Sequence, residues 1–154
     1  MLKRGFRSYH VILVAGLVAG VLDITAALVI SSLRGVKPMR VLQSIASGLL
    51  GLASYQGGLE TAALGLVLHF VIATGAAAVF YAASRKLTFL VRQTIGSGLL
   101  FGIAVYCFMN LVVLPISAFP HKISFPLSSL LIGVVVLMLC VGLPISLIVR
   151  RYST

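Results

Sequence analysis

The sequence predicts an all-α integral membrane protein with four transmembrane helices and one further short helix. Of its 154 residues, 60% are hydrophobic and 9% are charged, and the mean hydropathy is +1.18. Soluble domains average about 45–50% apolar and about 25% charged residues. This balance excludes a water-soluble domain, a disordered chain and a secreted module held together by disulfides. Because no linker or internal repeat stands out, residues 1–154 are predicted to form a single domain.

Four apolar stretches are long enough to cross the hydrocarbon core of a bilayer, which takes about 20 helical residues. Turn residues or charges bound each stretch. Pro126 suits the first turn of the last span, where no backbone donor is needed, and Pro144 near its end predicts a kink. The four predicted spans are 10–33, 59–83, 94–114 and 127–149.

The stretch 41–56 predicts the additional short helix. Its 16 residues would reach about 24 Å, which is short for a span. Gln43, Ser47 and Ser54 fall on one side and apolar residues on the other. This pattern favours an amphipathic helix in the interface or a re-entrant piece packed on protein. Gly57 and its neighbour Gly58 then permit a sharp turn into the second span.

The 12 basic and 2 acidic residues give a formal charge of +10. The basic residues cluster between apolar stretches, which is typical of anchors that contact anionic lipid headgroups, and no basic–aromatic stripe indicates a nucleic-acid partner. Four-span and five-span arrangements both place eight basic residues on one side and four on the other. Both arrangements make the 85–92 loop and the C-terminus cytoplasmic, while the N-terminus changes side. We favour four spans, in a bacterial inner membrane.

The two acidic residues, Asp23 and Glu60, lie within or at the edge of apolar stretches. A charge at the bilayer centre costs about 2.5–3.5 kcal/mol, so an acid at that depth needs a reason. Asp23 is about midway along the first span and His69 about midway along the second. Since consecutive spans are antiparallel, both residues fall at similar depth. Contact between Asp23 and His69 is predicted if the two helices are neighbours.

Three spans carry their polar residues on the same face as their small residues. Small residues allow helix backbones to approach closely in a membrane, so these faces are predicted to pack in the bundle interior. The three faces are Gly16, Gly20 and Asp23 in the first span, Gly65 and His69 in the second, and Gly98, Gly102, Tyr106 and Asn110 in the third.

The functional interpretation is a polar site in the middle of the membrane. Asp23 would hold one tautomer of His69, the group that titrates near neutral pH. Tyr106, Asn110 and Glu60 complete the list of candidate residues. The structural alternative is that these side chains form interhelical hydrogen bonds worth about 0.6 kcal/mol each. Glu60 also suits a helix N-terminus and has three possible basic partners nearby, namely Arg34, Lys37 and Arg40.

The side-chain inventory argues against an enzyme, a metal site or a cofactor. Two acids are too few for a multi-carboxylate metal centre. Cys107 and Cys140 lack metal-ligand spacing and are expected to be small buried apolar residues. Ser47 and Ser97 lie in Ser-Gly pairs that superficially resemble the nucleophile motif of an intramembrane serine protease, but the span count is too small.

Three segments resemble uncharacterised bacterial inner-membrane proteins of the YagU-like type. They are Gly16–Gly20, Gly65–His69 with the Ala-rich run to Tyr81, and Ser97–Gly102 leading to Pro115. Members of that group share a Gly/Ala-rich first span, a His-bearing second span and a Gly-rich third span that ends in Pro. The resemblance implies a small multi-pass membrane protein without an assigned activity, and it transfers no site residues.

Two functions follow from these patterns. The first is a channel, carrier or proton-responsive membrane protein that uses the polar mid-membrane site. The second is a non-catalytic accessory or assembly subunit of a larger membrane complex. Gly/Ala faces predict association with a second copy or with other membrane subunits.

Overall fold

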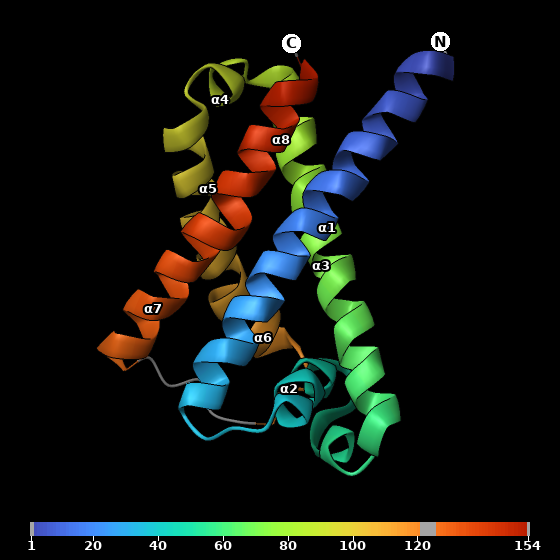
Figure 1. The fold of residues 1–154 in the computed structure, drawn as a ribbon, viewed down its shortest axis with the longest axis vertical. Coiled ribbons are helices and arrows are strands. Elements are labelled where there is room, and N and C mark those ends of the chain that lie inside the picture. The colour runs from blue at the N-terminus through green and yellow to red at the C-terminus, as the bar shows by residue number, and fades with distance from the viewer. Residues whose placement is uncertain (1, 121–125, 154) are drawn as a thin grey trace.

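The computed structural model describes residues 2–120 and 126–153, and all regular structure in those ranges is helical (Figure 1). Two short segments, η2 and η3, are π-helical, and η1 is a 3₁₀-helix. The elements are α1 (Leu2–Leu33), α2 (Pro38–Leu50), η1 (Gly51–Tyr55), α3 (Gly58–Lys86), α4 (Phe89–Arg92), α5 (Thr94–Phe108), η2 (Met109–Val113), α6 (Leu114–Ile116), α7 (Leu127–Leu137), η3 (Met138–Gly142) and α8 (Leu143–Ser153).

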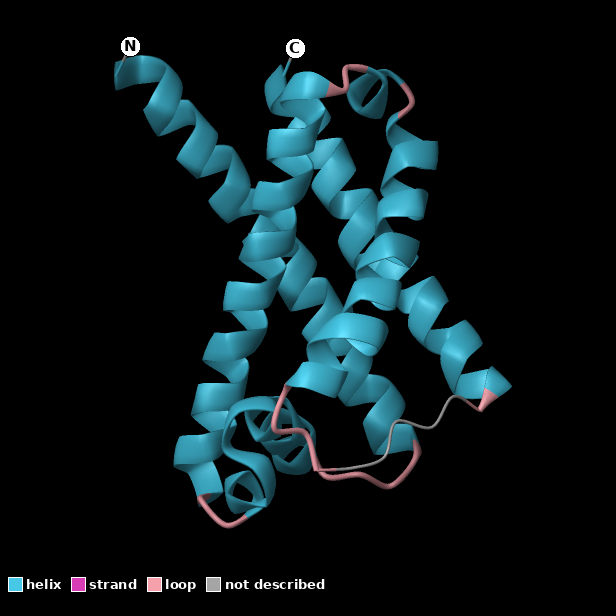
Figure 2. Cartoon of the chain, turned by 180° about the vertical axis from the view of Figure 1, so that it is seen from behind, coloured by secondary structure: helices cyan, strands magenta, loops and turns pink. Residues whose placement is uncertain are grey.

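The predicted all-α fold is confirmed, with four helical stretches long and apolar enough to cross a membrane. Both ends of the described chain lie at one end of the bundle, together with α4, and α2 lies at the opposite end (Figures 1 and 2). This arrangement matches the four-span topology, because α2 has only 13 residues and does not run the length of the bundle. The four stretches are Ser8–Leu33, Gly58–Lys86, Thr94–Ile116 and Leu127–Tyr152.

Each π-helical segment lies just before a proline. The ring of a proline clashes with the carbonyl four residues earlier and supplies no N–H to bond it. For Pro115 that earlier residue is Leu111, inside η2, and for Pro144 it is Cys140, inside η3. A wider π turn accommodates the missing hydrogen bond without ending the helix. The disturbance expected near Pro144 therefore takes the form of a π segment upstream of the proline.

Helices α1 and α3 pack at two glycines. A Cβ atom on Gly16 would lie 2.6 Å from the Thr74 Cα, and one on Gly20 would lie 2.7 Å from the Phe70 ring. At position 16 the obstructing atom is backbone, so only glycine permits this approach, whereas a Cβ atom at position 20 would require the Phe70 ring to move. The apolar core continues from this contact toward the chain ends and joins α1, α3, η3 and α8. Its buried residues are Val11, Ala15, Ala19, Ala77, Phe80, Val141, Ile145 and Val149.

Glycines also set the other two close helix contacts. Gly98 and Gly102 of α5 lie against Gly142 and the backbone around Met138. Gly65 of α3 lies directly beneath the Leu42 carbonyl of α2. The short helix is therefore packed on the protein by backbone contact, one turn of α3 from His69.

The contact at Gly102 predicts a large difference between two conservative substitutions in one helix. Gly102→Ala would place a methyl group 2.5 Å from the Met138 Cα and should destabilise the protein by about 1–3 kcal/mol, the usual cost of overpacking. Gly96→Ala is the control, because no atom lies within 4 Å of its Cβ position. Thermal unfolding in detergent measures both. Equal midpoints for the two variants would contradict the packing described here.

Candidate functional site

Asp23 of α1 and His69 of α3 lie side by side. The His69 Nε2 atom is 2.9 Å from the Gly20 carbonyl oxygen and 3.9 Å from the Asp23 Oδ2 atom. Because a carbonyl oxygen only accepts, Nε2 donates and carries the ring proton. The carboxylate is within ion-pair range of the ring but beyond hydrogen-bond length. The His69 side chain is 13% exposed and the Asp23 side chain 20%.

The pair lies inside the apolar stretches of both helices, at matching distances from their α2 ends. Asp23 is 10 residues from the end of α1 at Leu33, and His69 is 11 residues from the start of α3 at Gly58. At 1.5 Å per residue these separations are about 15 and 17 Å, roughly half of a 30 Å hydrocarbon core. The equal depth expected from antiparallel spans is thus present in the structure.

Gly20 has two roles in building this site. Its missing side chain leaves room for Phe70, whose ring lies edge-on to the His69 ring with centroids 5.6 Å apart. Its carbonyl oxygen, which belongs to the helical backbone of α1, accepts the additional hydrogen bond from His69. A glycine one turn before Asp23 therefore orients the imidazole next to the acid.

Cys140 is a neighbour that the sequence pattern did not indicate. It lies in η3, the π-helical segment that contacts α1, the helix that carries Asp23. The expectation that both cysteines are buried is wrong, because Cys107 is exposed on the bundle and Cys140 is half-buried. Pro144 was the only signal in the sequence near this residue, and a proline does not specify which side chain faces α1.

Tyr106 and Asn110 make contacts within their own part of the bundle. The Asn110 Nδ2 atom donates to the Tyr106 carbonyl at 2.9 Å, a bond inside one helix rather than between helices. The Tyr106 ring lies against Gly133 of α7, where a Cβ atom would approach it to 2.7 Å. In the described residues, no hydrogen bond or ion pair joins either side chain to Asp23 or His69.

Glu60 lies exposed in the first turn of α3, at the membrane edge rather than at the polar pair. The suggested pairing with Arg34, Lys37 or Arg40 does not occur among the described residues. Arg40 instead donates to the Tyr55 carbonyl at 3.4 Å and stacks 5.4 Å from the centre of the Tyr55 ring. Arg40 thus contacts Tyr55 rather than Glu60.

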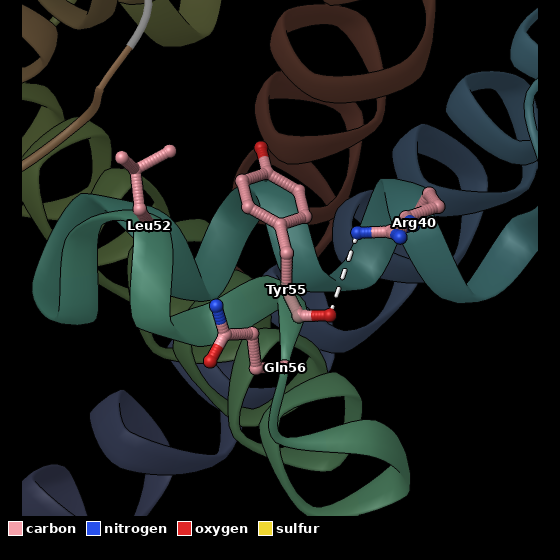
Figure 3. A pocket seen from close by; sticks show the side chains of 4 residues that line it. All are labelled: Arg40, Leu52, Tyr55 and Gln56. Atoms are coloured by element: carbon pink, nitrogen blue, oxygen red, sulfur yellow. Dashed lines mark hydrogen bonds between the residues drawn. The ribbon is translucent and has the colours of Figure 1, made fainter.

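Arg40 and Tyr55 also line an open pocket of about 510 Å³ with Leu52 and Gln56. Figure 3 shows the Tyr55 ring between Leu52 and Arg40, with the hydrogen bond to the Tyr55 carbonyl drawn beside it. Stacked aromatic and basic side chains are typical of anchors at a membrane–water interface. We interpret this pocket as part of the anchoring of α2, not as a catalytic cleft.

The polar face of α2 and η1 is turned into the protein. Gln43, Ser47 and Ser54 are almost completely buried. The Gln43 Nε2 atom donates to the Gly58 carbonyl at 3.0 Å, and the Thr61 hydroxyl donates to the Ser54 carbonyl at 2.6 Å. These bonds fix the short helix to the start of α3. Thr61 was not among the residues selected from sequence, because its role depends on a turn between the two helices.

The apolar side of α2 and η1 faces outward, with Leu49 63% and Leu52 67% exposed. An amphipathic helix that hides its polar side and presents leucines is suited to lipid rather than to water. The segment is packed on the protein at the end of the bundle opposite the chain termini, as a helix too short to span.

Within residues 2–120 and 126–153, no three His, Cys, Asp or Glu side chains come together as a metal-binding group. Comparison of the chain with protein-family models, curated proteins and solved structures finds no match. Functional inference therefore depends on the geometry of the Asp23–His69 pair and on the surface of the bundle.

The contact between Asp23 and His69 predicts a measurable coupling free energy. In a double-mutant cycle of Asp23→Asn and His69→Gln, unfolding in mild detergent should give a coupling of about 0.5–1.7 kcal/mol, the range of interhelical polar contacts in membranes. The matched control cycle combines Asp23→Asn with Asn110→Ala, and it should give a coupling near zero. A coupling in the test cycle no larger than in the control would refute the contact.

Proposed function

We propose that the chain is a proton-responsive multi-pass membrane protein of the channel or carrier type, with Asp23 and His69 as its working pair. The observation that carries the proposal is an acid 3.9 Å from an imidazole, inside two apolar helices that are long enough to span a membrane. Ionisable residues at this depth are expensive, and they mark proton relays and ion pathways more often than they serve packing. Each is the only residue of its kind near the centre of its span.

Charge balance explains why the pair responds to protons. An ionised Asp23 beside a neutral His69 leaves one net negative charge, which costs about 2.5–3.5 kcal/mol at the bilayer centre. One added proton, on the carboxylate or on the free Nδ1 of the ring, restores neutrality. The pair is therefore expected to hold this added proton at rest, besides the one on Nε2, and to release it when water reaches the site.

The surroundings favour access from the α2 side. Toward the chain ends, the α1–α3 contact is filled by Ala15, Ala19, Ala77 and Phe80, which offer no hydrogen-bond partner for water. Toward α2, the backbone of that helix lies against Gly65, one turn from His69, and the buried Gln43 amide bonds to Gly58 and Thr61 further along α3. A proton path toward α2 is therefore the one that leads to polar side chains.

We place the protein in a bacterial inner membrane with both termini and the 85–92 loop in the cytoplasm. The basis is the excess of basic residues on that side, eight against four in the sequence. The α2 end then faces outward, so protons would enter the site from the external side. The proposal includes no enzymatic activity and no nucleic-acid partner.

A second candidate, an accessory subunit of a larger membrane complex, is favoured by one observation. Only 6% of the apolar window of the third span is buried within the protein, compared with 22–33% for the other three spans. This surface is available to helices of another subunit or a second copy. Stoichiometric co-purification of other membrane proteins from the native membrane supports this role, and a single species on native mass determination supports autonomous action.

Proton flux into liposomes tests the first candidate. Purified protein is reconstituted with an internal pH-sensitive dye, and an inward proton gradient is applied. Asp23→Asn should lower the flux above that of empty liposomes on the order of tenfold or more, because a neutral amide cannot bind and release the proton. Glu60→Gln is the matched control, since it neutralises the only other acid and leaves the pair intact. Equal flux in wild type and in folded Asp23→Asn would overturn the proposal, as would wild-type flux no greater than that of empty liposomes.

A further inference from the structure

An apolar groove of about 580 Å³ separates α3 from α5 and η2. It runs along Ile72, Ala76 and Val79 on one side and Phe101, Val105 and Phe108 on the other. Gly75 contributes to its width, because nothing lies within 4 Å of the position that a Cβ atom would take. Val79 and Phe108 are more than half exposed, so the groove is open to the surroundings of the bundle.

Three exposed cations lie at the end of the bundle nearest the chain termini, where α3 and α4 end. Arg85 and Lys86 end α3, and Arg92 ends α4, the short helix that connects α3 to α5 (Figure 2). Lys86 follows Val79 by seven residues, two helical turns, and so lies on the groove face of α3. The two acidic residues of the chain are Asp23 and Glu60, and neither forms an ion pair with these cations in the described structure.

We propose that this groove and its three cations form a binding site for one anionic phospholipid. The phosphate contacts Arg85, Lys86 and Arg92, and an acyl chain fills the groove. The dimensions agree, because Val79 lies about 10 Å and Ile72 about 21 Å along α3 from Lys86, while one leaflet of a bilayer is about 15 Å deep. A chain that starts at the cations therefore enters the groove beyond Val79.

Charge favours a lipid over a second copy of the protein. A parallel copy seated in the groove would bring its own Arg85, Lys86 and Arg92 beside those already there, and like charges repel at this distance. An anionic headgroup supplies the missing negative charge. The inference uses neither Asp23 nor His69, and it holds or fails independently of the proposed proton site.

Lipid binding is measured by native mass spectrometry of the full chain released from mild detergent. Phosphatidylglycerol and phosphatidylcholine with identical acyl chains are the probes. We expect one retained phosphatidylglycerol, bound at least about tenfold more tightly than phosphatidylcholine, since each basic residue at a membrane surface contributes about 1 kcal/mol toward an anionic lipid.

Two pairs of variants separate the site from general charge attraction. Neutralising Arg85, Lys86 and Arg92 together to Gln should abolish the preference, whereas neutralising Arg34, Lys37 and Arg40 removes equal charge from the opposite end and should preserve it. Gly75→Leu should fill the groove and expel the lipid, and Gly96→Leu, equally unobstructed but outside the groove, should not. Ala104→Leu, which also lines the groove, repeats the test if Gly75→Leu fails to fold.

Several results would overturn the inference. Equal loss of preference in both charge variants would mean diffuse electrostatic adsorption. Full retention of the lipid by folded Gly75→Leu and Ala104→Leu would mean that the groove takes no part. A wild-type dimer that Gly75→Leu converts to a monomer would identify a second copy as the occupant instead.

Discussion

Lipid chains are as apolar as leucine side chains, so helices inside a bilayer gain little by burying apolar surface against each other. They must instead bring their backbones close enough for dispersion contacts and polar bonds between helices. In this protein Gly16, Gly20, Gly65 and Gly102 lie at helix contacts that a Cβ atom would obstruct. The close approach at these glycines determines how α2 packs on α3 and how α3 packs on α1, beside the Asp23–His69 pair.

The polar pair shows how packing and chemistry are connected. Gly20 brings α3 near enough for its own carbonyl to accept a bond from His69, and this bond leaves Nδ1 as the ring atom free to take a proton. The Asp23 Oδ2 atom, one turn further along α1, lies 3.9 Å from the His69 Nε2 atom, so any charge on the ring acts on the carboxylate. A larger residue at position 20 would displace the Phe70 ring, which lies edge-on to the His69 ring. The same glycine thus controls both the interface and the electrostatics of the site.

Span length and polarity made much of the fold predictable. Four apolar stretches bounded by charges gave the four membrane helices, and the alternation around Gln43, Ser47 and Ser54 indicated an amphipathic helix too short to cross. The shared depth of Asp23 and His69 followed from antiparallel order. These features depend only on distance along the chain, which the sequence contains directly.

Other features depend on which of several available hydrogen-bond or charge partners a side chain contacts. Sequence patterns do not determine that choice. Asn110 shares a helix face with Gly102, yet its amide bonds to the backbone of its own helix, an option that no spacing excludes. Glu60 was paired with nearby cations in our interpretation, but Arg40 is satisfied by Tyr55. The π turn that contains Cys140 has no signal in the sequence beyond Pro144 itself.

Basic and acidic residues are distributed differently between the interior of the bundle and its surface. Basic residues occupy the ends and the connections, where water and headgroups solvate them, while one of the chain's two acids lies within a span. Attraction between those cations and Asp23 across 15 Å of low-dielectric medium cannot replace a local partner, because water and salt screen the exposed cations. In the proposed function the acid is neutralised locally, by His69 and a proton, and in the proposed lipid site the surface cations bind an anionic headgroup. This separation explains how a chain of formal charge +10 can carry an acidic group in its interior without an internal cationic partner of lysine or arginine.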